Sequence, residues 1–407
     1  MQKEDERMKR FFLLGIIVFF ALAASPVLAQ TAKPSGEPIK IGGSLGLTGL
    51  FAEQSKWIKG GYDAWVEEIN QKGGLLGRPV KMIIYEDEGN TDKAVTFFER
   101  AITVDKVDLV FGGYPATINV AIMPLCEKYG KVYISMGGHM KSFQQGYTYS
   151  FGSPPLMADW ADIAMYGILD DLIPKANWPK TAALVTMNNV VGQACRKALL
   201  TVAEKRSIKV VVDEVYNLPL SDATPLVSKA RSQRAELFCP LSFFADGVMI
   251  TRAAKGMNYN PKIMFHALAP AIPAWMKELG TDGNNALTFH WWNARLKFPG
   301  NDQINAAAKR KFNLPEAPTY FGFGYSWMKS LEVAVQGAGT LDHKKIRDYL
   351  RSRSFDFPYG QGVKFDEKGL PAPYAIVTQT TNGHNEIVWP AGQATAKLAY
   401  PKPNWTR

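Results

Sequence analysis

Apolar and polar positions follow two alternating periods along most of the chain. The run Ile39–Leu45 is short and mostly apolar, and it predicts a strand. The next segment places Ile58, Tyr62, Trp65 and Ile69 at the spacing of one helical face, and so predicts a helix. This succession of strand and helix recurs as far as about residue 352.

Strands that alternate with helices are typical of parallel sheets covered by helices on both faces. Two long runs of this alternation predict an α/β fold with two doubly wound parallel-sheet lobes. The further predicted strands are 78–87, 107–113, 131–138, 181–187, 208–216, 235–243, 261–268, 374–379 and 385–390. The further predicted helices are 91–105, 117–129, 191–205, 223–233, 245–257, 301–312, 320–337 and 341–352.

The first 29 residues have the pattern of a secretory signal peptide. Lys9 and Arg10 precede the apolar run Phe11–Ala24, which is shorter than the roughly 20 residues that a membrane-spanning helix needs. Val27 and Ala29 stand where signal peptidase requires small residues. We therefore expect cleavage after Ala29 and a soluble mature chain that is exported to the periplasm and is not embedded in a membrane.

Composition excludes some partners. The formal net charge is +10, but the basic residues are scattered rather than gathered in a stripe with aromatic residues. This distribution argues against nucleic-acid binding. It leaves two interpretations open, which are a solvated basic surface and a general attraction for anionic ligands.

The cysteines give no metal or redox motif. Cys126, Cys195 and Cys239 are widely spaced, without a C-x-x-C pair or a Cys/His ligand spacing. Cys126 lies in a helical pattern and is expected to be buried as a small apolar residue. A disulfide between Cys195 and Cys239 is open, because spacing alone does not decide it.

No catalytic, metal-binding or cofactor-binding residue is predicted. The chain contains no H-E-x-x-H, no G-x-S-x-G and no G-x-x-x-x-G-K-[ST] motif. Gly43, Gly46 and Gly49 follow a strand, but their spacing differs from that of a dinucleotide-binding loop. Asp87 and Glu88 could form a metal-binding pair, although a solvated loop is the preferred interpretation.

Small and hydroxyl residues mark three predicted strand ends, at Thr48, Thr117 and Gly137–His139. Ligands of open parallel sheets bind beyond the carboxyl ends of the strands, where helix N-termini present N–H groups. The loop before Thr117 suits a carboxylate better than a pyrophosphate, because no lysine accompanies it. His139 and His266 follow strand ends, where a histidine either faces a cleft or packs in the core.

Several of these segments resemble the leucine/isoleucine/valine-binding family of periplasmic receptors, the type I substrate-binding proteins of ABC importers. The resemblance rests on "IKIGGSLGLTGLFAEQS", on "EINQKGGLLGRP" followed by "EDEGN", and on "VDLVFGGYPATINVA". It implies two lobes that close on a ligand, joined by three crossings near residues 152, 290 and 371. Lobe 1 would then comprise 37–152 plus 291–370, and lobe 2 would comprise 153–290 plus 371–400.

The resemblance also implies a binding site. Ala116 and Thr117 on one side and the segment Gly137–His139 on the other would meet a ligand carboxylate, while Tyr320 would contact the ligand's side chain. The complete set of expected ligand-binding residues is Thr48, Gln54, Tyr114, Ala116, Thr117, Gly137, Gly138, His139, Val191, Phe243, Leu268 and Tyr320.

The chain departs from the family's pattern at three places. His139 stands where amino-acid binders have a threonine, Val191 stands where they have an aromatic residue, and no acid follows the strand 261–268. A buried ammonium without a partner is costly, so we hypothesise a ligand other than an ordinary α-amino acid, unless another acid substitutes. An aliphatic or aromatic carboxylate or an amide would suit a wall of aromatic residues, which could equally pack in the core or hinge. The candidates for this wall are Phe243, Phe244, Trp291 and Tyr320.

Three functional hypotheses follow from the sequence. The first is a periplasmic receptor that delivers a small solute to the permease subunits of an ABC importer. The second is a sensory receptor of the same fold that signals to a regulatory partner. The third, an exported two-lobed enzyme, is disfavoured because no nucleophile, base and orienting group can be assembled from the motifs.

Overall fold

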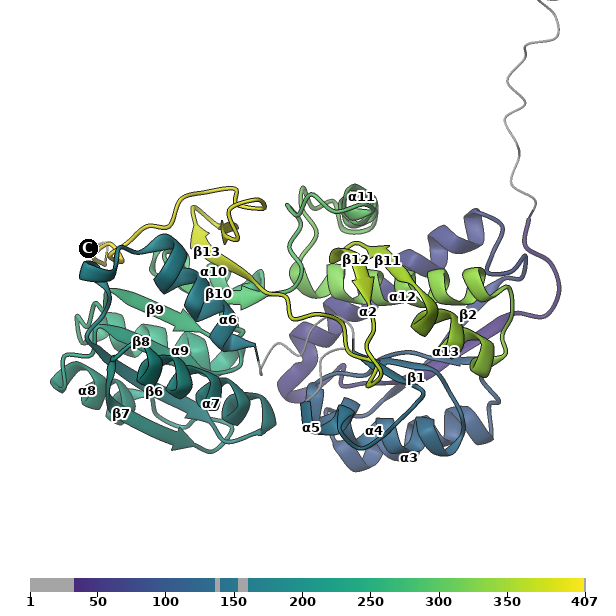
Figure 1. Ribbon diagram of the computed structural model, residues 1–407, viewed down its shortest axis with the longest axis horizontal. Coiled ribbons are helices and arrows are strands. Elements are labelled where there is room, and N and C mark those ends of the chain that lie inside the picture. Colours follow the sequence, from purple (N-terminus) through teal and green to yellow (C-terminus); the bar gives the residue numbers. More distant parts are fainter. Residues whose placement is uncertain (1–32, 136–139, 153–159, 406–407) are drawn as a thin grey trace, which may run out of the picture.

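A computed structural model describes residues 33–135, 140–152 and 160–405. Figure 1 shows two lobes side by side, joined by a narrow region. The C-terminus lies on the lobe drawn at the left, and the N-terminal strands lie in the lobe at the right. We call the right-hand lobe lobe 1 and the left-hand lobe lobe 2.

Lobe 1 is assembled from an early and a late part of the sequence. Its early elements are β1 (Ile39–Leu45), α2 (Ala52–Gln71), β2 (Val80–Glu86), α3 (Thr91–Thr103), β3 (Leu109–Val110), α4 (Ala116–Lys128), β4 (Tyr133–Ser135), α5 (Met140–Phe143) and β5 (Ser150–Gly152). Its late elements are α11 (Asn301–Phe312), α12 (Thr319–Ala338), α13 (His343–Ser352), β11 (Ser354–Phe357) and β12 (Gly360–Lys364).

Lobe 2 is formed by the middle of the chain and by two strands near its end. Its elements are α6 (Ala161–Tyr166), β6 (Thr181–Met187), α7 (Val190–Lys205), β7 (Lys209–Tyr216), α8 (Thr224–Ser232), β8 (Leu237–Leu241), α9 (Phe244–Gly256), β9 (Ile263–His266), α10 (Ala274–Leu279), β10 (Leu287–His290), β13 (Ile376–Thr381) and β14 (His384–Trp389).

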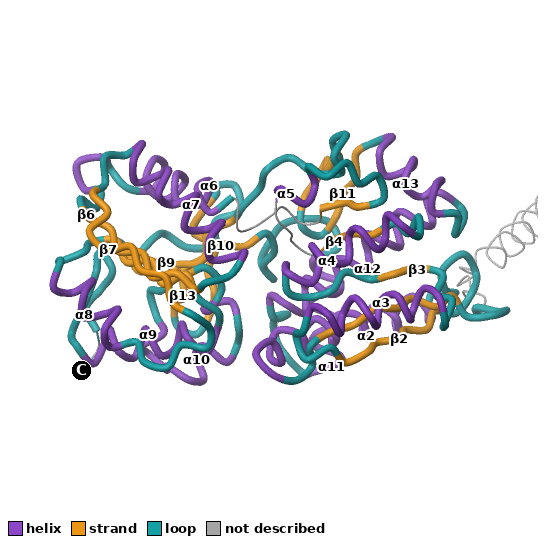
Figure 2. Tube along the Cα trace, turned by 90° about the horizontal axis from the view of Figure 1, so that it is seen from below, coloured by secondary structure: helices purple, strands orange, loops and turns teal. Residues whose placement is uncertain are grey.

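The sheets confirm the predicted α/β class. In lobe 1, β1 pairs in parallel with β2 and β3, and β4 pairs in parallel with β5. Lobe 2 has one sheet in the order β14-β13-β10-β9-β8-β6-β7, in which only β13 and β14 run antiparallel to their neighbours. Figure 2 shows α6 and α7 on one face of this sheet and α8, α9 and α10 on the other, as expected for a doubly wound lobe.

Two glycines allow the main helices of lobe 1 to pack unusually close together. A Cβ on Gly324 of α12 would lie 2.2 Å from the carbonyl oxygen of Ile58 on α2, and a Cβ on Gly61 would lie 2.3 Å from that of Phe321. Further along, the Trp65 indole N–H donates to Glu332 at 2.8 Å. These contacts hold α2 and α12 together in lobe 1.

Most long elements are found where the hydrophobic pattern predicts them, within a few residues. The pattern missed α5, α6, α10, β5, β10, β11 and β12, all of which are six residues or shorter. Cys126 is buried in α4 as expected, and Cys195 and Cys239 are also buried and free, without a disulfide. No helix of the described ranges is both long enough and apolar enough to cross a bilayer.

Candidate functional site

Helix N-termini from both lobes converge where the strands end. In lobe 1, β1 leads into α2 and β3 leads into α4, while in lobe 2 β6 leads into α7 and β8 leads into α9. The first residues of α2, α4, α9 and α12 receive no hydrogen bond from a capping side chain. Uncapped first turns leave N–H donors and a partial positive charge, which favour an anionic ligand.

A continuous series of contacting aromatic rings, which we call the aromatic chain, runs along this region. Within lobe 1, Phe51 meets Tyr114 edge-on with ring centroids 5.7 Å apart, and Tyr114 meets Tyr320 at 5.6 Å. Tyr320 then contacts Phe323 at 5.1 Å, and Phe323 stacks on Trp291 at 4.1 Å. Trp291 follows β10 directly, so the aromatic chain ends on a segment that crosses between the lobes.

The other end of the aromatic chain joins the two lobes. Phe51, which precedes α2, meets Phe243 of lobe 2 edge-on with centroids 5.1 Å apart. Both rings are buried, and Phe243 is the residue from which α9 begins. The structure therefore shows the two lobes in contact through these rings.

The tyrosine hydroxyls of the aromatic chain remain protonated at neutral pH. Burial raises the pKa of Tyr320 to about 12, although its hydrogen bond with Tyr114 partly lowers it. Burial, reinforced by the neighbouring Tyr320, raises the pKa of Tyr114 well above its ordinary value. The two hydroxyl oxygens are 3.4 Å apart, a weak hydrogen bond that leaves a donor for a ligand oxygen.

The glycine-rich loop after β1 serves close packing. A Cβ on Gly46 would lie 2.5 Å from the backbone nitrogen of Gly89, and Gly49 has a φ of +74° that favours glycine. Asp87 was expected in a solvated loop, and that expectation is wrong. The Asp87 carboxylate is fully buried and accepts hydrogen bonds from Ser44 at 2.6 Å and from the Gly89 N–H at 2.8 Å. Its role is to hold this loop against β1.

The structure brings together part of the predicted ligand-binding set. Tyr114, Tyr320 and Phe243 belong to the aromatic chain. Gln54 is buried in the first turn of α2, and its side-chain nitrogen has no partner in the described residues. These four positions come from three different segments of lobe 1 and from lobe 2.

The other predicted residues are more dispersed, and their contact with a ligand stays a prediction. Ala116 and Thr117 are half-buried at the start of α4, and Val191 is buried at the start of α7. Leu268 is buried just beyond β9. Thr48 is exposed, with its hydroxyl 3.3 Å from the carboxylate of Glu86. Gly137, Gly138 and His139 lie outside the described residues.

Sequence reasoning missed Phe51 and Phe323 of the aromatic chain. Phe51 lies two residues after the "GLTG" turn, and Phe323 lies one helical turn after Tyr320. Both positions carried a usable signal, because each is an aromatic residue adjacent to a predicted site residue. Phe244, in contrast, is only half-buried and has no ring partner among the contacts of the described residues.

An acid in lobe 2 was also missed. Asp246 lies in the first turn of α9, three residues after Phe243, and is buried. One of its carboxylate oxygens accepts a hydrogen bond from the Leu220 N–H at 3.2 Å. Burial raises the pKa of Asp246, although the Leu220 N–H and the Tyr216 hydroxyl partly oppose that rise.

Two histidines lie at the ends of neighbouring strands in lobe 2. His266 ends β9 and His290 ends β10, and both are buried. Burial lowers the pKa of each imidazole to about 3, so both are neutral at physiological pH. His266 packs edge-on against Trp275 at 5.0 Å, and within the described residues neither of its ring nitrogens has a hydrogen-bond partner.

The two-lobed α/β fold and its uncapped helix N-termini agree with the family that the sequence matches. The sequence profile described as "periplasmic binding protein" covers residues 38–385. The chain belongs to the periplasmic binding protein family. Within this family, it is 22% identical over 392 residues to the Leu/Ile/Val-binding protein homolog 7 of Brucella abortus, covering 92% of this chain and 97% of that relative.

Two solved structures, of a substrate-binding and a solute-binding protein, illustrate the range of ligands on this fold. The branched-chain amino acid transporter protein LivJ of Streptococcus pneumoniae, in complex with isoleucine, matches with a TM-score of 0.76, 19% identity, and coverage of 87% of this chain and 100% of that one. A solute-binding protein of R. palustris in complex with benzoate also matches with a TM-score of 0.76, with 16% identity and coverage of 90% and 99%. These similarities establish the fold.

Proposed function

We propose that this periplasmic binding protein captures a small carboxylate that lacks an α-amino group and delivers it to the permease of an ABC importer. The observation that carries the proposal is the aromatic chain beside uncapped helix N-termini. Together they offer a flat apolar surface and backbone N–H donors, which suit an aromatic or aliphatic carboxylate. The benzoate-bound R. palustris structure supports the choice of ligand class.

The positions of the acidic residues in lobe 2 support a ligand that has no α-amino group. An α-amino acid needs a carboxylate for its ammonium, and none follows β9, where His266 is succeeded by "ALAPAIP". Asp246 is the nearest alternative, but one of its oxygens is already used by the Leu220 N–H, and its raised pKa makes the charged form less favourable.

The proposed mechanism of capture is closure of the two lobes on the ligand. A ligand that touches α4 in lobe 1 and α9 in lobe 2 binds the closed form more tightly than any open one, so it shifts the population toward closure. Delivery to a permease is proposed from the family to which the chain belongs. A sensory receptor would use the same closure, and a regulatory partner instead of a permease would distinguish it.

The test is a thermal-shift screen of residues 30–407 with branched-chain amino acids, benzoates, aliphatic carboxylates and amides. A ligand at a hundred times its dissociation constant stabilises the folded state by about 2.7 kcal/mol, which raises Tm by several degrees. We expect stabilisation by amine-free carboxylates. Stabilisation by leucine or isoleucine alone would contradict the proposed ligand class.

The variant Asp246→Asn tests whether Asp246 binds an ammonium group of the ligand. If an amino acid binds through Asp246, the variant loses that stabilisation, because the ammonium loses its counter-charge. If an amine-free carboxylate binds, the variant retains its response. A screen in which no small carboxylate, amino acid or amide raises Tm would overturn the proposed function itself.

A further inference from the structure

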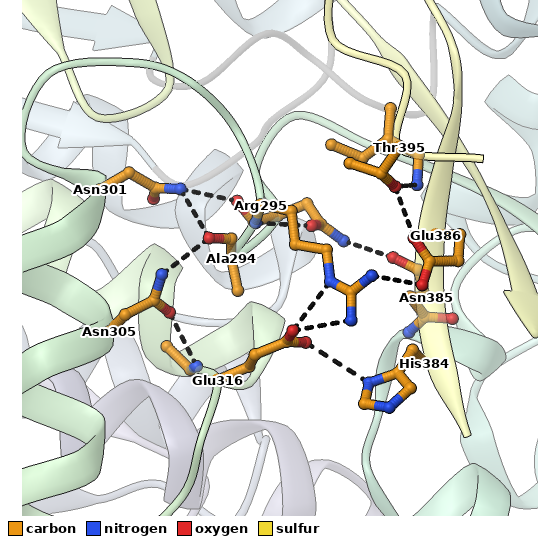
Figure 3. A network of polar contacts seen from close by, with 12 residues as sticks. Ala294, Arg295, Asn301, Asn305, Glu316, His384, Asn385, Glu386 and Thr395 are labelled. Carbon is orange, nitrogen blue, oxygen red and sulfur yellow. Dashed lines mark hydrogen bonds and ion pairs between the residues drawn. The ribbon is translucent and has the colours of Figure 1, made fainter. Parts of the chain in front are cut away.

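The segment that follows β10 is tied to both lobes by an unusually dense polar network. Figure 3 shows Arg295 of this segment between two carboxylates that come from different lobes. Glu316 lies in lobe 1, just before α12, and Glu386 lies in lobe 2, on β14. Arg295 is therefore placed where the relative position of the lobes is set.

The guanidinium of Arg295 bonds to both carboxylates at once. Its Nε donates to Glu316 at 2.8 Å, its Nη2 lies 2.7 Å from the same oxygen, and its Nη1 donates to Glu386. His384 of β14 adds a direct contact between the lobes, with Nδ1 3.6 Å from the second oxygen of Glu316. Only about a quarter of the Arg295 side chain is exposed (26%), so solvent screens these contacts less than those of a free surface pair.

The backbone around Arg295 is held as firmly as its side chain. Asn301 of α11 donates to the carbonyl oxygens of Asn293, Ala294 and Leu296, at distances between 2.8 and 3.2 Å. Asn305 of α11 donates to Ala294 as well, at 2.7 Å. These bonds fasten the crossing segment to lobe 1.

On the other side, the crossing segment is fastened to lobe 2. The Asn293 side chain donates to the Asn385 carbonyl oxygen at 2.9 Å, and the Lys297 N–H donates to the Gln393 side chain at 3.0 Å. Opening the lobes by rotation about this crossing would move Glu316 relative to Glu386. The contacts of Arg295 are the charged links between them, so they favour one relative position of the lobes.

We infer that Arg295 is a positioning residue that stabilises the closed arrangement of the lobes before any ligand binds, and so sets the affinity of the interlobe site. The inference rests on the proposed closure around a ligand. Without Arg295, two carboxylates from opposite lobes would face each other without a counter-charge, and repulsion would favour opening. Because apparent affinity scales with the closed fraction, Arg295 increases affinity without touching the ligand.

The experiment compares the ligand-free protein with its Arg295→Met variant by small-angle X-ray scattering. We expect a larger radius of gyration for R295M, with far-UV circular dichroism and cooperative unfolding retained. An equal radius of gyration for the two proteins would overturn the inference. This measurement needs no ligand, so its failure is distinguishable from failure of the proposed function.

Two further variants separate positioning from a general loss of charge. Arg196→Met removes a comparable pair within lobe 2, where Arg196 of α7 bonds to Asp213 of β7 and is 30% exposed. It should leave the radius of gyration unchanged. Adding Glu316→Gln to R295M should reverse part of the expansion, because it removes one of the two facing carboxylates. Expansion in R196M, or none of the expected reversal, would contradict the inference.

Calorimetry with benzoate and with isoleucine then measures the effect on binding. For whichever probe binds, R295M should weaken the affinity by about tenfold or more, the size expected for losing a hydrogen bond to a charged group. R196M should bind as the wild type does. Equal affinity in R295M and wild type would show that the network plays no part in ligand capture.

Discussion

The two lobes treat their buried titratable groups differently. In lobe 1, His343 of α13 has both ring nitrogens engaged, since Nδ1 accepts from the Val132 N–H at 2.9 Å and Nε2 lies 2.8 Å from the Asp108 carbonyl oxygen. In lobe 2, His266 has neither nitrogen engaged by a described residue. The half-buried His343 of lobe 1 thus holds elements of its own lobe together. In lobe 2, the buried histidines lie at strand ends, where replacing a side chain changes the site and disturbs the fold less.

The two longest helices of lobe 1, α2 and α12, approach each other closely, and disturbing this approach should have the largest effect. Gly324→Ala places a methyl group 2.2 Å from the Ile58 carbonyl oxygen, which forces α2 and α12 apart. We expect a loss of about 2–3 kcal/mol in the free energy of unfolding, measured by urea denaturation.

Gly256→Ala in lobe 2 is the matched control. Gly256 is the last residue of α9, and a Cβ there would meet no heavy atom within 4 Å. This variant should be neutral or stabilising by about 0.5 kcal/mol, because alanine favours a helix more than glycine does. Similar losses in G324A and G256A would refute the role given to the close approach of α2 and α12.

Acid should destabilise lobe 2 more than lobe 1. Burial lowers the pKa of His266 and His290 to about 3 and that of His343 to about 4, all below the value of about 6.5 for an unfolded histidine. Below pH 6.5 the unfolded chain therefore binds protons that the native protein does not, and stability falls as the pH decreases toward the folded pKa values. At pH 5 each histidine should cost about 2 kcal/mol relative to pH 7.

Hydrogen exchange at pH 7 and pH 5 would assign this loss to a lobe. Protection should decrease more in β9 and β10, which carry two of the histidines, than in the elements that contact His343. His290→Gln should reduce the pH dependence of lobe 2. An equal decrease of protection in both lobes would mean that the unpartnered nitrogens of lobe 2 carry no special sensitivity.

Disturbing the contact between the lobes should have a smaller effect than the Gly324→Ala variant or the change to acid pH. Phe243→Leu removes the edge-to-face contact with Phe51 while keeping an apolar side chain, and it should weaken binding by about tenfold. Phe51→Leu should weaken binding similarly, and the double variant should add little, because both remove one contact. Fully additive losses in calorimetry would show that the two rings act on the ligand separately.

Most elements of the fold were predictable because apolar periodicity is a local property of the sequence. Helix α3 was predictable from its apolar periodicity, although its capping residue is Asn90, whose side chain accepts a hydrogen bond from the Lys93 N–H, and not the expected Thr91 or Asp92. β10 is four residues long and offers no period to detect, yet it leads into the crossing that carries Arg295. Short buried strands are specified by their neighbours in the sheet rather than by their own pattern.

The site was less predictable, because its contacts join distant parts of the chain. Tyr114 and Tyr320 were both expected at the site from the family resemblance, but no periodicity links them. Arg295, Glu316 and Glu386 looked like ordinary surface charges in the sequence, and only the fold brings them together. Asp87 illustrates the opposite error, since an acidic loop residue is usually solvated but here is buried by Ser44 and Gly89.

The nested order of the two lobes also constrains how the chain acquires its structure. Lobe 2 interrupts lobe 1 between β5 and α11, and α12, which packs on α2, follows α2 by well over two hundred residues. The first half of lobe 1 must therefore wait, with apolar surface uncovered, until nearly the whole polypeptide has emerged. Neither lobe can be excised as one uninterrupted fragment, and a truncation before β13 would leave lobe 2 unfinished, with β10 as an unpaired edge.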